Sequence, residues 1–149
     1  MYLLEIGMAG VFLLGCTWFD IKTLKIPLWL LAMGSAAGLT VSGLEIFLGT
    51  RAMPELLLSI LPGISLLVIA IFARRQIGSG DGWMILNMGL ILGVKNTLFS
   101  VEMGFFFLLF PAFWFYSIRK ERKKILPLAP FLFAGSSLVA LGGILGIGG

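Results

Sequence analysis

Two aspartates, Asp20 and Asp81, are the residues of this sequence whose type and position could support catalysis. They are the only aspartates in the chain, and each lies where a long apolar run meets a short polar stretch. Two facing carboxylates can activate a water molecule: one takes a proton from the water, and the other, protonated, polarises the carbonyl group under attack. The plainer alternatives are a helix N-cap for Asp81 and a solvated side chain beside Lys22 for Asp20.

The rest of the composition excludes most other catalytic chemistry. The chain has no histidine and a single cysteine, Cys16, which lies in an apolar run and is expected to be a small buried side chain. These counts exclude Ser–His and Cys–His catalysis, HExxH zinc sites, an intrachain disulfide and multi-cysteine metal clusters. We therefore expect neither a metal nor a cofactor. The net charge of +4 is better explained by membrane topology than by nucleic acid, which we do not expect as a partner.

The elements that must position the aspartates are membrane-spanning helices. Hydrophobic residues make up 59% of the chain and charged residues 12%, whereas soluble domains are about 25% charged. A span needs about 20 apolar residues. The sequence predicts an all-α integral membrane protein with six transmembrane helices in a single membrane-embedded domain, residues 1–149, because six apolar runs lie at 2–19, 26–48, 56–73, 82–94, 97–118 and 126–147. These runs are too long for strands and lack the alternation of a β-barrel.

The basic residues predict how the helices are oriented. Nine of the eleven lysines and arginines lie in the first, third and fifth loops between the runs. By the positive-inside rule these loops are cytoplasmic, so both termini face outside. Asp20 then ends the first helix and Asp81 begins the fourth, both at the cytoplasmic face, where they can meet. The N-terminus has neither a basic n-region nor an A-x-A site, so we expect no secretory signal peptide.

Three segments together resemble the type IV prepilin peptidases, a family of GxGD membrane aspartic proteases. The first is Asp20–Pro27, an aspartate followed by Ile-Pro at the family's spacing, and the second is the Gly-x-Gly-Asp motif at residues 78–81. The third, Leu126–Leu132, is similar to the family's final proline-containing segment, and the order of the three also agrees. The resemblance implies that Asp20 and Asp81 are the catalytic pair and that Gly78 and Gly80 shape the active-site loop.

The resemblance also implies a substrate and a location. Such a peptidase cleaves the short basic leader from prepilin or pilin-like precursors, just before an apolar helix, at the cytoplasmic face of the cytoplasmic (inner) membrane. Its partners are therefore the precursor and the lipid bilayer. Larger members carry an additional domain with a cysteine cluster and methylate the new N-terminus, and we expect only the peptidase activity here. Trp83 stands where the family often has lysine, so no role is carried over to that position, whereas Pro127 and Pro130 are expected to place the last helix.

Helix dipoles predict different roles for the two acids. Asp81 begins a helix, where the dipole favours the ionised form, and Asp20 ends one, where the dipole disfavours it. Asp81 is then the base and Asp20 the protonated partner. The effect is about 0.3–1 kcal/mol, and Lys22 or Lys25 could cancel it.

Two other classes of protein remain as alternatives. Carboxylates within a membrane also mark the ion paths of small transporters and channels. A transporter should place polar residues near the midplane, where this sequence offers mainly Asn87, serine and threonine. A non-catalytic membrane subunit of a secretion or pilus system is the second alternative, and it would leave the shared depth of the two aspartates unexplained.

Overall fold

The computed structural model describes residues 2–72, 79–117 and 127–145 of the chain. These residues form five helices and no strand: α1 (Tyr2–Thr23), α2 (Leu28–Phe47), α3 (Met53–Phe72), α4 (Ser79–Ser117) and α5 (Ala129–Ile144). The first four are long and apolar enough to cross a membrane, and α5 is a shorter apolar helix. The predicted all-α membrane class is confirmed, but the structure has five helices where the sequence predicted six.

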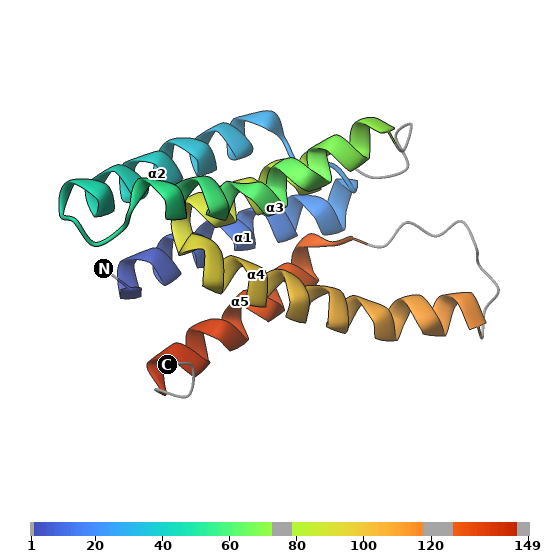
Figure 1. The fold of residues 1–149 in the computed structure, drawn as a ribbon. Helices are drawn as coiled ribbons and strands as arrows, with labels where there is room; N and C mark the ends of the chain where they lie inside the picture. Colours follow the sequence, from blue (N-terminus) through green and yellow to red (C-terminus); the bar gives the residue numbers. More distant parts are fainter. Residues whose placement is uncertain (1, 73–78, 118–126, 146–149) are drawn as a thin grey trace.

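The difference in helix number lies in α4, which consists of two helical segments joined at Gly93. The backbone of Gly93 is non-helical, with φ 77° and ψ 175°, in a region that is open to glycine but strained for other residues. The chain reverses there, so that the first segment lies along α3 and the second runs back beside α5 (Figure 1). The break was predicted at Lys95 and Asn96, which instead continue the helix. The runs at 82–94 and 97–118 therefore correspond to the two segments.

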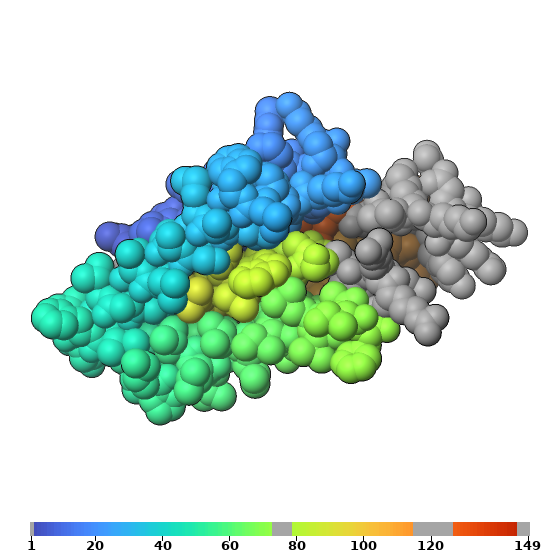
Figure 2. All heavy atoms as spheres, turned by 90° about the horizontal axis from the view of Figure 1, so that it is seen from above, coloured from blue at the N-terminus to red at the C-terminus, as the bar shows by residue number. Residues whose placement is uncertain are grey.

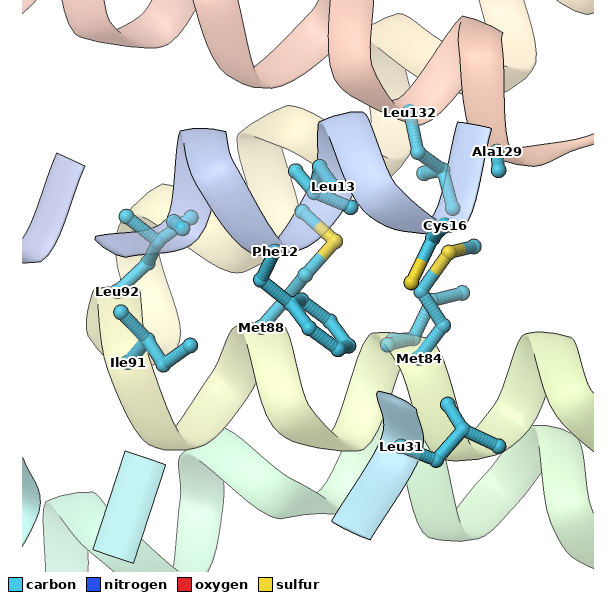
Figure 3. Close-up of a cluster of buried hydrophobic side chains, with 12 residues drawn as sticks. Phe12, Leu13, Cys16, Leu31, Met84, Met88, Ile91, Leu92, Ala129 and Leu132 are labelled. Carbon is cyan, nitrogen blue, oxygen red and sulfur yellow. The ribbon is translucent and has the colours of Figure 1, made fainter. Parts of the chain in front are cut away.

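The first segment of α4 is the centre of the bundle. It lies between α2 and α3 in the view of Figure 2. On its other side is α1, which separates it from α5 (Figure 3). Here Leu13 and Cys16 of α1 pack with Met84 and Met88 of α4 and Leu132 of α5, all fully buried. Cys16 is thus the small buried side chain that its position predicted.

Glycines allow α3 and the first segment of α4 to approach closely. A Cβ atom added to Gly63 would lie 2.5 Å from the Cα atom of Leu86, and one added to Gly89 would overlap the carbonyl group of Ser59. Close backbone approach between small residues is the usual means of packing helices in membranes, where apolar lipid offers no hydrophobic drive for association. The pairs Gly63–Leu86 and Gly89–Ser59 also show that the two helices run antiparallel.

Replacing Gly89 by alanine is expected to destabilise the protein by about 1–3 kcal/mol, because the new methyl group forces α3 and α4 apart. Gly43→Ala is the matched control. Gly43 lies inside α2, and a Cβ atom there meets nothing within 4 Å, so helix propensity should make that variant neutral or slightly more stable. The unfolding midpoints of the purified variants in detergent compare the two changes. Equal midpoints for both variants would contradict the close approach of α3 and α4.

Candidate active site

Asp20 and Asp81 come together at one end of the helix bundle. Asp20 lies in the last turn of α1 and Asp81 in the first turn of α4. Because α1 and the first segment of α4 pack side by side in opposite directions, the end of one helix meets the start of the other. The two carboxyl groups are close enough for the charge of Asp20 to act on Asp81. This is the juxtaposition that the predicted topology requires.

Asp20 is held by the first residue of α5. Its side chain is buried, with 6% of the residue exposed, and its Oδ2 atom accepts a hydrogen bond from the backbone N–H of Ala129 at 2.9 Å. This bond joins residues that are 109 positions apart in the sequence. Asp20 is therefore not the solvated interfacial residue of the plainer alternative. Lys22 does not need it as a partner either, since the Lys22 Nζ atom lies 4.0 Å from the ring centroid of Trp18.

The start of α5 needs an acceptor from another helix. Its N-cap residue, Leu128, has no side chain that could accept a backbone hydrogen bond, and Pro130 in its first turn has no N–H to donate. The amides of Phe131 and Leu132 bond back to the carbonyl of Leu128. The N–H of Ala129 is the one that reaches Asp20, so this proline-containing segment gives α5 a helix start with a free donor.

Asp81 is less buried than Asp20. It is the third residue of α4, inside the helix rather than at its N-cap, and it is half-buried. Gly80 is also helical, and a Cβ atom on it would meet Ile26 at 3.6 Å, so the described part of the Gly-x-Gly-Asp motif is a helix start. Gly78 lies outside the described residues. Trp83 is 43% exposed.

A second polar cluster lies at the other end of the bundle, beside Gly93. Arg51 is buried, and its Nη1 atom donates to the carboxylate of Glu45 at 3.0 Å and to Ser42 Oγ at 3.2 Å. The same guanidinium donates to the carbonyl oxygens of Gly89 and Leu90, both at 3.0 Å. These carbonyls belong to the last turn of the first α4 segment, where a helix end leaves carbonyl groups that need other donors, and the carbonyl of Leu90 also accepts from Ser42 Oγ at 2.6 Å. Arg51 therefore caps the segment that carries Asp81 at its other end.

Sequence reasoning missed both Ala129 and Arg51. Ala129 acts through its backbone, and its residue type gives no signal. The one indication was its context, since it lies between a leucine that cannot cap a helix and a proline. Arg51 is one of the two basic residues that lie outside the first, third and fifth loops, and sequence reasoning assigned it no other role. An arginine in a mostly apolar chain is costly to bury alone. The glutamate at position 45, six residues before Arg51, was therefore the available indication of a buried ion pair.

The helical fold, with its long apolar helices, makes this chain a multi-pass membrane protein. The sequence model of the Type IV leader peptidase family matches residues 8–146. The chain belongs to this family, which confirms the resemblance carried by the three sequence segments, and it is therefore a peptidase that acts on a protein substrate. Searches of curated proteins and of solved structures found no match.

Proposed function

We propose that this protein is an aspartic endopeptidase of the cytoplasmic (inner) membrane that removes the short basic leader from prepilin or pilin-like precursors. Asp20 and Asp81 are its catalytic pair, and Gly78 and Gly80 shape the backbone that leads to Asp81, Gly80 as part of the first turn of α4. The observation that carries the proposal is that the two carboxylates, on separate helices, lie at the same end of the bundle, near enough for the charge of Asp20 to act on Asp81. Residues 1–149 act as one membrane-embedded peptidase domain.

The proposed topology has six spans with both termini outside. The two segments of α4 count as separate spans in this arrangement, since the chain reverses at Gly93 (Figure 1). The aspartates then lie at the cytoplasmic ends of their helices, on the side of the predicted basic loops. A precursor whose basic leader stays in the cytoplasm and whose next segment is an apolar helix presents its cleavage site at that depth.

The reaction uses the pair as acid and base. Two carboxylates at close range hold one proton between them, because both cannot be ionised cheaply. The ionised carboxylate takes a proton from water, and the resulting hydroxide attacks the scissile carbonyl carbon. The protonated carboxyl group donates to the carbonyl oxygen. When the carbon–nitrogen bond breaks, the first carboxyl group returns its proton to the leaving amine.

The interior of the bundle supports the transporter alternative less well. Asn87 is fully buried in the first segment of α4, but both ends of its amide are used within the protein. Its Nδ2 atom donates to the carbonyl of Leu31 at 2.9 Å, and its Oδ1 atom accepts from the hydroxyl of Ser35 at 2.8 Å. An amide held in this way joins α2 to α4, and this structural role accounts for its burial without a transported ion.

Co-expression with a pilin-like precursor tests the proposal. We expect a shortened product whose new N-terminus, read by protein sequencing, begins at the junction between the basic leader and the apolar segment. The purified protein should give the same product in detergent, and a chelator such as EDTA should not slow it, because a carboxylate pair needs no metal. Absence of the shortened product with every co-encoded pilin-like precursor would favour the transporter or non-catalytic subunit.

A further inference from the structure

The start of α5 provides a third helix end at the candidate active site. The sequence identifies only the two helices that carry the aspartates, and their dipoles favour an ionised Asp81. The structure adds the N-terminus of α5, whose first amide points at Asp20. A helix N-terminus carries a partial positive charge, and an N–H donor bonds more strongly to a carboxylate than to a carboxylic acid. The N-terminus of α5 therefore favours the ionised form of Asp20.

The two carboxylates differ in the partners that the structure gives them. Asp20 is buried and has a backbone donor at 2.9 Å. Asp81 is half-buried in the first turn of α4, and no hydrogen bond to it is found among the described residues. Because burial makes an ionised carboxylate depend on its hydrogen-bond donors, the negative charge of the pair is better accommodated on Asp20.

Other titratable groups around Asp20 are few in the described part of the chain. Asp81 of α4 and Cys16 of α1 lie near it. Lys22 stacks on Trp18, and Lys25 is exposed in the loop between α1 and α2. Helix α5 contains no titratable side chain. The titratable residues of α2 and α3 lie near the opposite ends of those helices: Glu45 and Glu55. The amide of Ala129 is thus the main described group on Asp20 that could distinguish it from Asp81.

We propose that the backbone N–H of Ala129 is a positioning group that keeps Asp20 ionised, so that Asp20 is the base and Asp81 carries the proton. The assignment rests on the proposed function and reverses the roles expected from the dipoles of α1 and α4 alone. The bond from Ala129 uses Oδ2 of Asp20 and leaves Oδ1 for the water. Asp20 takes the water proton and later gives it to the leaving amine. Asp81 lends its proton to the carbonyl oxygen and recovers it when the carbon–nitrogen bond breaks.

The protonation state can be measured without any substrate, because the chain contains only two aspartates. Protein grown with aspartate labelled with carbon-13 at the side-chain carboxyl gives two resonances, which Asp20→Asn and Asp81→Asn assign by removing one each. We expect, at the pH of maximal activity, the Asp20 resonance at the position of a carboxylate and the Asp81 resonance at that of a carboxylic acid. The opposite pattern would overturn the assignment and would leave the proposed function intact.

The part played by the N–H group is tested by replacing Ala129 with its hydroxy-acid analogue, lactic acid, which changes the amide to an ester and keeps the side chain. We expect the acidic limb of the activity–pH profile to move up by about one pH unit, the effect of losing one hydrogen bond to a charged group. The alkaline limb, which reports Asp81, should stay in place.

The same replacement at Ala140, further along α5, is the matched control and should leave both limbs unchanged. If the ester at position 129 moves the alkaline limb instead, Asp20 is the protonated partner and the proposal fails. If it moves neither limb, Ala129 has only a structural role. Wild-type protein that cleaves no precursor would count against the proposed function itself, while the resonances would still test the protonation of the pair.

Discussion

Asp20→Asn and Asp81→Asn are each expected to lower the rate of leader cleavage by at least about a hundred-fold, the effect of removing one acid–base group from a site. Asparagine has the size of aspartate but can neither take a proton from water nor give one to the substrate. The rates are measured with purified protein and a pilin-like precursor under single-turnover conditions, so that product release does not hide the chemical step.

Measuring the unfolding midpoint beside the cleavage rate of each variant separates a loss of catalysis from a loss of folded structure. The side-chain carbonyl of an asparagine at position 20 can still accept the hydrogen bond from Ala129, so both variants should keep unfolding midpoints close to that of the wild type. The double variant should be little slower than either single one, because groups that act as a unit do not contribute independently. Glu55→Gln, an exposed acid at the start of α3, is the control that should keep full activity. Cleavage that survives either aspartate substitution would rule out the carboxylate pair.

Arg51→Met is expected to cost about 3–5 kcal/mol of stability, the usual cost of removing one partner of a buried ion pair. The change leaves Glu45 buried without its cation and leaves the carbonyls of Gly89 and Leu90 without the guanidinium donor. Methionine retains most of the apolar volume, so the loss measures the charge and the hydrogen bonds. The unfolding midpoint in detergent and the amount of folded protein recovered from membranes both report it.

Two further variants make the Arg51 test specific. Lys95→Met removes a cation from an exposed position in the next turn and should change the stability by less than about 0.5 kcal/mol. Combining Arg51→Met with Glu45→Gln removes the charge of Glu45, although Glu5, buried beside it, remains, and should recover part of the loss. If Arg51→Met were no more harmful than Lys95→Met, the guanidinium would not be the cap that holds the break at Gly93.

The class of fold and the placement of both aspartates at one end of the bundle could be predicted, because both follow from the order and length of the apolar runs. Apolar runs of sufficient length must form helices in a bilayer, and the asymmetry of basic residues orders their ends. The position of the α4 break could not be predicted in the same way. The polar pair Lys95 and Asn96 predicts the boundary, but a lysine can stay in a helix and extend its charge toward water. Gly93 is one of twenty glycines in the chain, and only the tertiary structure shows which of them adopts the positive φ.

The roles of the two acids also depended on information that the sequence lacks. The helices that carry Asp20 and Asp81 are evident from the apolar runs, and the sequence-based prediction used the dipoles of these two helices alone. The contact on which the proposed assignment rests comes from a backbone amide of α5, and backbone groups are the same in every residue except proline. Pro127 and Pro130 were expected to place this helix, and in the structure Pro130 lies in its first turn. The pairing of the Ala129 amide with Asp20 depends on the packing of α1 against α5, which the sequence does not reveal.

The hydrogen bond between Asp20 and Ala129 can form only after both helices that carry these residues have been synthesised. Residues 20 and 129 are near opposite ends of the sequence, so a ribosome-bound or partly inserted chain has Asp20 long before it has the amide that holds it. A protease that assembled its charge-bearing group early could cut other membrane proteins while its own folding was incomplete. Because α5 is synthesised after α1 and α4, the proposed catalytic pair lacks its backbone donor until α5 has packed against α1.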